Sequence, residues 1–233
     1  MIGDGFQMMR LLLINPNTSA ATTDMMVAIA QSAAPRGVEI IGATAASGVP
    51  MILDPVALSA ASHEVLKIGI GLSQGASGII VGAFGDPGLA VLRREVLLPV
   101  VGIAEASMLE AAAGGRRFGV ATTTPKLVGV IVEAARLLGL AALYAGTRLA
   151  AGDPEGLLAD PHALEEALAA AVAESVRSDK AETVVIGGGP LGGAAAGLAA
   201  RFGDLVVEPI PAAVRKLVAM LERGTLLPTA GPK

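Results

Sequence analysis

Cysteine is absent from this chain of 233 residues, and aromatic residues are scarce. Without cysteine the protein can form no disulfide, no thiolate metal site and no thiol nucleophile. One Tyr, four Phe and no Trp leave the packing of the core to Ala, Leu, Val and Ile. Because only two histidines are present, a histidine-based metal site is not expected either.

Positive charge is also limited, with 17 basic against 21 acidic residues. A net charge of −4, no basic stripe and few aromatics argue against nucleic-acid binding. No apolar stretch reaches about 18 uninterrupted residues, so no transmembrane helix is predicted. The first ten residues, MIGDGFQMMR, carry an acid where a signal peptide would carry basic charge. We therefore expect a short leader, with Met8 or Met9 as an alternative start, and a cytoplasmic protein with no membrane partner.

Apolar residues, in contrast, make up 53% of the chain and charged residues only 16%. This excess favours a homo-oligomer, because self-association hides apolar surface. Short apolar runs alternate with longer Ala/Leu-rich segments, which is typical of βαβ units and predicts an α/β fold. The predicted strands are 10–14, 38–44, 78–83, 99–103, 117–121, 142–146, 183–186 and 205–207. The predicted helices are 18–34, 55–71, 88–95, 126–138, 161–177 and 211–223.

The second half of the chain repeats the first at a nearly constant spacing. LLLINPNTS resembles FGVATTTPK, which pairs Asn15 with Thr122, 107 residues apart. GIIVGAFGDPGL resembles TVVIGGGPLGGA, which pairs Ala83 with Gly188 at a spacing of 105, and PVVGIAEA matches DLVVEPIPAA at 106. The repeat predicts two similar parallel-sheet lobes related by a pseudo-two-fold axis. Ligands of such sheets bind beyond the carboxyl ends of the strands, so the paired loops should meet in one cleft.

The boundaries of the lobes follow from the same repeat. Lobe 1 is placed at 10–106 and lobe 2 at 107–208. The C-terminal helix, 209–223, is expected to complete lobe 1, and 1–9 and 224–233 are expected to be flexible ends.

The turn after the first strand is a candidate ligand site. Backbone N–H groups at a helix start, together with amide and hydroxyl side chains, suit a carboxylate or an imide oxygen. Helix capping explains Asn17 or Thr18 equally well. It explains Asn15 less well, because that residue lies at the strand end before Pro16, so Asn15 is predicted to contact the ligand.

The matching turn of lobe 2 is Thr122-Thr123-Thr124-Pro125, whose hydroxyls can donate to an anion. Thr124 is the natural helix cap, with Pro125 at the first helical position. Thr122 and Thr123 are therefore the better ligand candidates.

Two further loops follow the third strand of each predicted lobe. In AFGDPG, Asp86 precedes a proline at a helix start, which is more typical of a cap than of a general base. In the glycine loop, Gly187, Gly189 and Gly192 spell the dinucleotide fingerprint GxGxxG. Pro190 removes a backbone donor that a pyrophosphate would need, so we expect no cofactor. Glu208 follows a strand end and either reaches the cleft or caps the next helix.

Five motifs together resemble the hydantoin/allantoin racemase branch of the aspartate/glutamate racemase superfamily: INPNTS, AFGDPGL, PVVGIAEA, TTTP and GGGPLGG. The resemblance spans most of 10–221 and implies two flavodoxin-like lobes with a small site between them. It also implies two catalytic cysteines, one from each lobe, that move a proton on opposite faces of a carbon next to a carbonyl. The corresponding positions here are Ala83 and Gly188, and neither can exchange a proton.

The sequence therefore leads to a superfamily enzyme, an isomerase or lyase, with a cysteine-independent mechanism. Its substrate would be a small carboxylate or a hydantoin-like cyclic amide, and no metal is expected. The alternative is a non-catalytic protein that binds a small carboxylate in the same cleft. An engineered loss of the cysteines is a third explanation, disfavoured because GGGPLGG reads as a coherent glycine loop. Asp86 and Glu208 are weak candidates for catalysis. The binding residues are predicted to be Asn15, Ala83, Phe84, Thr122, Thr123, Gly188, Gly189 and Pro190.

Overall fold

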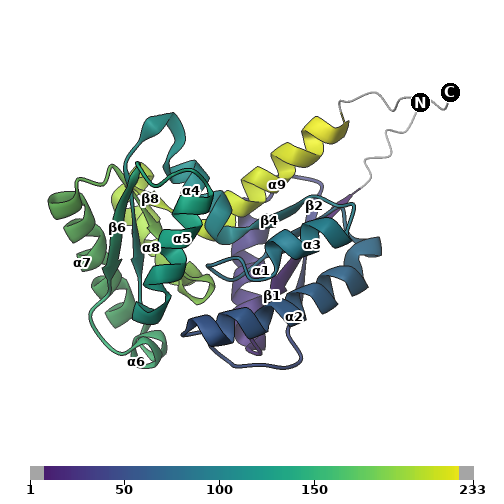
Figure 1. Cartoon of the computed structure of the whole chain (residues 1–233), viewed down its shortest axis with the longest axis horizontal. Coiled ribbons are helices and arrows are strands. Elements are labelled where there is room, and N and C mark those ends of the chain that lie inside the picture. Colours follow the sequence, from purple (N-terminus) through teal and green to yellow (C-terminus); the bar gives the residue numbers. More distant parts are fainter. Residues whose placement is uncertain (1–7, 226–233) are drawn as a thin grey trace.

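A computed structural model describes residues 8–225, in which two parallel sheets stand next to each other (Figure 1). The first sheet has the order β2-β1-β3-β4 and the second the order β6-β5-β7-β8. All of their strand pairs are parallel. The strands are β1 Met9–Asn15, β2 Val38–Thr44, β3 Gly78–Val81, β4 Val100–Gly102, β5 Phe118–Thr122, β6 Tyr144–Leu149, β7 Thr183–Ile186 and β8 Val206–Val207. The predicted α/β fold with two parallel-sheet lobes is confirmed, while the two-fold axis between them stays a prediction.

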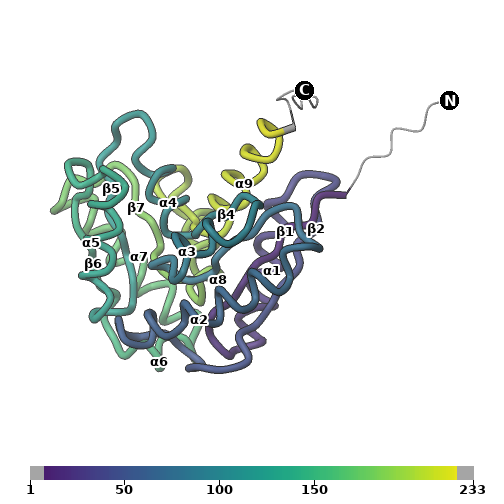
Figure 2. Tube along the Cα trace, turned by 45° about the vertical axis from the view of Figure 1, so that its right-hand side comes forward, coloured from purple at the N-terminus to yellow at the C-terminus, as the bar shows by residue number. Residues whose placement is uncertain are grey.

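Helices pack against both sheets. They are α1 Ala20–Ala33, α2 Pro55–Leu72, α3 Leu89–Glu95, α4 Ile103–Ala111, α5 Val128–Leu137, α6 Pro154–Ala159, α7 Pro161–Asp179, α8 Gly192–Phe202 and α9 Pro209–Thr225. The last helix, α9, contacts α1, α4, β3 and β4, so the end of the described chain returns to the first lobe (Figure 2). Within the described residues, no helix combines the length and apolar character needed to cross a membrane.

Three of these helices were not predicted. The α4 helix starts directly after a three-residue strand, and its first residue, Ile103, falls within the predicted strand 99–103. The α8 helix has the sequence GGAAAGLAARF, and its glycines lower helix propensity. The α6 helix has only six residues. Tertiary packing supplies what local propensity does not.

The predicted flexible ends need a partial correction. Met9 already belongs to β1, where its neighbour on β2 is Val38, and α9 continues through Gly224 to Thr225. Residues 1–7, which belong to the expected leader, and residues 226–233 lie outside the described residues.

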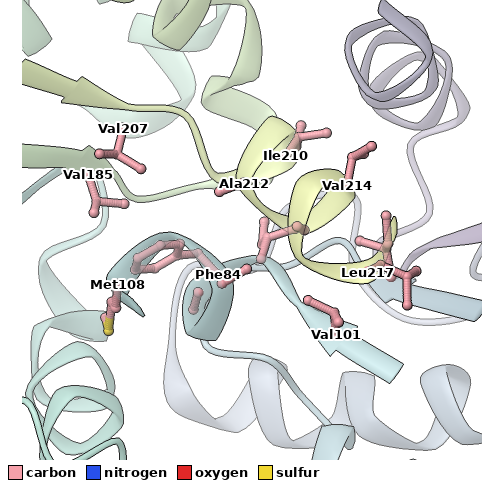
Figure 3. Packing of buried hydrophobic residues seen from close by; sticks show 14 of the residues in the cluster. Phe84, Val101, Met108, Val185, Val207, Ile210, Ala212, Val214 and Leu217 are labelled. Atoms are coloured by element: carbon pink, nitrogen blue, oxygen red, sulfur yellow. The ribbon is translucent and has the colours of Figure 1, made fainter. Parts of the chain in front are cut away.

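A continuous apolar core joins the lobes. One cluster of buried residues contains Leu11 of β1 and Phe118 of β5, together with Phe84 and Met108 between them. Figure 3 shows Phe84 and Met108 with neighbours from both lobes and from α9. The lobes therefore pack against each other directly, and this packing fixes the loops that meet at their junction.

Candidate functional site

A pocket lies where loops of the two lobes meet, and it encloses about 570 Å³ with its mouth included. Its walls come from the turns after β1 and β5, the loops after β3 and β7, and a few residues of α2, α5 and the segment between β2 and α2. The lining residues are Asn17, Met51, Ile52, Leu58, Gly82, Ala83, Phe84, Thr123, Thr124, Leu127, Ile131, Gly187, Gly188, Gly189, Pro190 and Leu191.

Asn15 does not line this pocket but lies buried behind its wall. Its Nδ2 donates to the Oδ1 of Asn17 at 2.9 Å, to the Ser19 carbonyl at 3.0 Å and to the Oγ1 of Thr23 at 3.0 Å. Its Oδ1 accepts from the Asn17 N–H at 3.2 Å. Asn15 thus holds the turn in shape and fixes Asn17, which does line the pocket.

Capping of α1 is performed by Ser19, whose hydroxyl accepts from the Thr22 N–H. The suggested caps Asn17 and Thr18 are therefore not the capping residues. The Oδ1 of Asn17 instead accepts from the Ser19 N–H at 2.9 Å. The Nδ2 of Asn17 donates to no acceptor among the described residues, so this amide can donate to a ligand in the pocket.

In the second lobe, Thr122 is likewise buried behind the pocket, while Thr123 and Thr124 line it. The Thr122 hydroxyl donates to the Gly187 carbonyl at 2.7 Å and lies 3.1 Å from the Thr124 hydroxyl. Thr124 is the N-cap residue of the short helical turn Pro125–Leu127, but its side chain makes no capping hydrogen bond. The hydroxyl of Thr123 has no hydrogen-bond partner within residues 8–225 and is available to a ligand.

The loops after β3 and β7 touch at the pocket. A Cβ built on Gly189 would lie 2.4 Å from the carbonyl oxygen of Gly82. A Cβ on Gly187 would lie 3.1 Å from the Phe84 ring. The structure thus brings Ala83 and Gly188 from opposite lobes to the walls of one pocket, next to Phe84, Gly189 and Pro190.

These glycines serve close packing. Gly192, the last of the fingerprint, has Ile29 of α1 within 2.8 Å of a built Cβ, and Gly189 has the main chain of lobe 1 against it. The fingerprint spacing therefore reflects contact between the lobes. No group of three or more His, Cys, Asp or Glu residues in the described part of the chain could hold a metal ion.

None of the lining residues is ionisable. The catalytic candidate Asp86 lies outside the lining, and its carboxylate accepts from the N–H groups of Ala104 at 2.9 Å and Glu105 at 2.7 Å. Burial raises the pKa of Asp86 to about 7, against the opposite effect of those two N–H groups. Asp86 is a helix cap, as predicted, but it caps α4 and not the helix that follows it in the sequence. The N-cap residue of that helix, α3, is Gly88.

Glu208 also lies outside the pocket lining. Its backbone carbonyl accepts from the Ala212 N–H at 3.1 Å at the start of α9. Burial raises the pKa of Glu208, Arg215 lowers it and Glu110 raises it further. Neither of the two acids is therefore placed to reach a molecule in the pocket directly.

Sequence reasoning missed the apolar wall of the pocket. It consists of Met51 and Ile52, Leu58 at the start of α2, and Leu127 and Ile131 in lobe 2. The only signal was the apolar run VPMIL, residues 49–53, in the connection between a strand and a helix.

Comparison with known proteins places the chain in a family. The family model described as Asp/Glu/Hydantoin racemase matches residues 11–217. This chain belongs to the Asp/Glu/hydantoin racemase family. It is 29% identical over 219 residues to a hydantoin racemase of Paenarthrobacter aurescens, with 93% of this chain and 92% of the relative covered.

Solved structures of family members agree with this assignment. An allantoin racemase from Klebsiella pneumoniae has 31% identity and a TM-score of 0.86, with 93% of this chain and 89% of that chain covered. An allantoin racemase from Pseudomonas fluorescens has 29% identity and the same TM-score, with 93% and 92% covered. The chain is thus a member of an isomerase family. It carries no thiol at Ala83 and Gly188, the two positions at which the sequence resemblance predicts catalytic cysteines.

Proposed function

We propose that this chain is a racemase-family enzyme that binds a small hydantoin-like cyclic amide and acts at its carbon next to a carbonyl without cysteine. The observation that carries the proposal is the lining of the pocket, where neutral hydrogen-bonding groups of both lobes face an apolar wall. A cyclic amide offers N–H and C=O groups to Asn17 and Thr123. An apolar substituent on its ring suits Met51, Ile52 and Leu58.

A free carboxylate fits this pocket less well. No Lys, Arg or His lines it, so a bound carboxylate would meet no opposite charge. Burying an unpaired charge is far more costly than burying a hydrogen-bonded amide. Of the two substrate classes that the sequence left open, the neutral cyclic amide is therefore the better match.

The chemistry would rest on stabilising an enolate. Within the described residues, the backbone N–H groups of Ala83, Phe84 and Thr123 make no hydrogen bond to another part of the chain. Donors of this kind stabilise an oxyanion that develops on the substrate carbonyl. Because no lining side chain can accept the proton, hydroxide from solvent removes it, forming water, and a water molecule returns a proton to either face.

The second candidate is a binding protein without chemistry. It is favoured by one specific observation, the lack of any ionisable group in the lining, because α-proton exchange normally needs a positioned acid or base.

Incubation of one enantiomer of 5-isobutylhydantoin with the protein in D₂O separates the two candidates. Deuterium at the ring carbon is followed by NMR, and binding is measured by calorimetry. The enzyme predicts exchange above the protein-free rate, and Asn17→Ala should weaken both binding and exchange. Asp204→Asn, at an exposed site of lobe 2, is the control that should change neither. Binding without exchange supports the binding protein, and the absence of both contradicts both candidates.

We also infer a homo-oligomer. Val56, Leu97 and Leu137 are exposed by 80%, 106% and 70%, and contact with another copy would cover such side chains. Light scattering after size-exclusion chromatography tests this, and a monomer at micromolar concentration would contradict it. The cytoplasmic location stays a prediction.

A further inference from the structure

Asp86 has more contacts than a helix cap requires. Its backbone N–H donates to the Ala83 carbonyl at 3.0 Å, and its own carbonyl accepts from the Leu89 N–H at 3.2 Å. Its carboxylate accepts from two backbone N–H groups at the start of α4. One residue therefore joins the pocket loop, the start of α3 and the start of α4.

The backbone of Asp86 is held in an unusual conformation. Its φ is +49°, in the left-handed region that is uncommon for residues other than glycine, although Asp adopts it more readily than most. Strain of this kind persists only where the surroundings impose it, and it concentrates at functional sites. Here the hydrogen bonds described above impose it.

The helix that Asp86 caps has no cap of its own. The N-cap position of α4 is Gly102, which has no side chain to offer. A Cβ on Gly102 would lie 2.1 Å from the Asp86 Cγ, so glycine is needed there to make room for the carboxylate. The capping side chain is instead supplied by a loop earlier in the sequence.

The position of α4 gives this cap a wider effect. It follows the last strand of the first sheet, leads into the second lobe, and contacts α9, α5 and β7. Its Met108 lies in the same buried cluster as Phe84, the pocket residue two positions before Asp86 (Figure 3). Fixing the loop to α4 therefore fixes the Ala83 side of the pocket relative to the opposite lobe.

We propose that Asp86 is a positioning residue, whose carboxylate fastens the Ala83–Phe84 wall of the pocket to the helix connecting the two lobes. This role concerns the same pocket as the proposed function. Its test uses no substrate, so failure of the proposed function would leave it intact.

The absence of cysteine allows a direct test. Ala83→Cys places a single thiol on the pocket wall, and its reaction with a maleimide dye too large for the closed pocket reports on release of the loop. Adding Asp86→Ala or Asp86→Asn should raise the labelling rate about fivefold or more, because losing a capping side chain shifts a local equilibrium by this order. Asp86→Asn should have the smaller effect, because its amide keeps one acceptor oxygen.

Asp160 provides a matched control. Its carboxylate also caps a helix with two backbone N–H groups, those of His162 and Ala163, at 3.1 Å each, but it caps α7 and is absent from the pocket lining. Added to Ala83→Cys, Asp160→Ala should leave the labelling rate of the introduced thiol unchanged. Gly102→Ala is a second way to displace the Asp86 carboxylate, should Asp86→Ala not fold, and it should raise the rate as Asp86→Ala does.

Amide hydrogen exchange of peptides covering 100–108 shows whether the cap has been broken. Faster exchange there together with faster labelling supports the proposal. Faster exchange with unchanged labelling would overturn it, because Asp86 would then cap α4 without holding the loop. An equal rise with Asp160→Ala would also overturn it, since the effect would be general destabilisation. Unchanged exchange and labelling in both Asp86→Ala and Gly102→Ala would show that the carboxylate fastens nothing.

Discussion

The two lobes hold corresponding turns in different ways. After β1, the Asn15 side chain binds Asn17, Ser19 and Thr23, all within its own turn and helix. After β5, Thr122 reaches sideways to the carbonyl of Gly187, at the end of the neighbouring strand. The side chain of Asn15 thus bonds only within its own turn and helix, whereas that of Thr122 depends on the position of the glycine loop.

The second pair of loops differs in the same manner. The loop after β3 is fastened through a polar side chain, Asp86, whereas the loop after β7 is fitted by close contact of Gly189 with the Gly82 carbonyl. Polar fastening tolerates small changes of volume, but contact at van der Waals distance does not. The two halves of one duplicated fold should therefore respond differently to substitution.

The largest effect is expected from giving both loops the thiols that the resemblance associates with catalysis. Ala83→Cys with Gly188→Cys should increase deuterium exchange into a chiral 5-substituted hydantoin by about 10² or more, since positioned acid–base groups contribute that order. Either single variant should do little for racemisation, because one base cannot serve both faces.

The double variant can be active only if the glycine loop accommodates a side chain at position 188. A Cβ on Gly188 would lie 2.8 Å from the Leu191 Cγ, so that side chain must move. Adding Leu191→Ala to the double variant provides the room. A double variant that folds, with or without this addition, and exchanges no faster than the wild type would show that the two positions do not face one reacting carbon.

A smaller but still severe loss of stability is expected from a substitution at the contact between the lobes. Gly189→Ala brings a methyl group to 2.4 Å from the Gly82 carbonyl oxygen, so the loops must separate. We expect a loss of roughly 1–3 kcal/mol in the free energy of unfolding and loss of ligand binding. Gly193→Ala is the control from the same motif, because nothing lies within 4 Å of its built Cβ. Equal stability of the two variants in urea denaturation would refute the close-contact interpretation.

The extent to which the sequence predicted this arrangement differs between fold and site. Short apolar runs between longer Ala/Leu-rich segments, together with the repeat, were sufficient to predict two parallel sheets, because buried strands leave a local pattern. Local pattern could not show that Asn15 and Thr122 turn away from the pocket, since a strand-end polar residue serves a ligand or its own turn equally well. Nor could it show that Asp86 caps α4, because its partners are 18 and 19 residues later. Such contacts depend on tertiary packing, which motifs do not encode.

A third, smaller effect concerns how much each of the two turns contributes to the free energy of unfolding. Asn15→Ala removes several buried hydrogen bonds and leaves their partners unsatisfied, so a loss of about 2–3 kcal/mol is expected. Thr122→Val keeps the shape and loses the bond to the Gly187 carbonyl, at about 1 kcal/mol. Denaturant unfolding measures both values. A greater loss for Thr122→Val would mean that the turn of lobe 2 is the more tightly held.

The smallest effect concerns two glutamates that follow the last strand of each lobe. Burial acts to raise the pKa of Glu105, but Arg93 and Lys216 together bring it below its usual range. Burial raises the pKa of Glu208, with Arg215 opposing and Glu110 adding to the rise. The two carboxyls should therefore make the stability of the protein depend on pH in opposite directions.

For Glu105, with its lowered pKa in the folded protein, the stabilisation is present above the unfolded pKa and is lost as pH falls through the folded pKa. For Glu208, the stabilisation is present below the unfolded pKa and is lost as pH rises through the raised, folded pKa. Unfolding of the wild type, Glu105→Gln and Glu208→Gln between about pH 3 and 7 measures both. The advantage of the wild type over Glu105→Gln should grow with pH, and its advantage over Glu208→Gln should shrink, each by less than about 1 kcal/mol. Changes in the same direction for both variants would contradict the assigned environments, because each slope follows from the sign of its pKa shift.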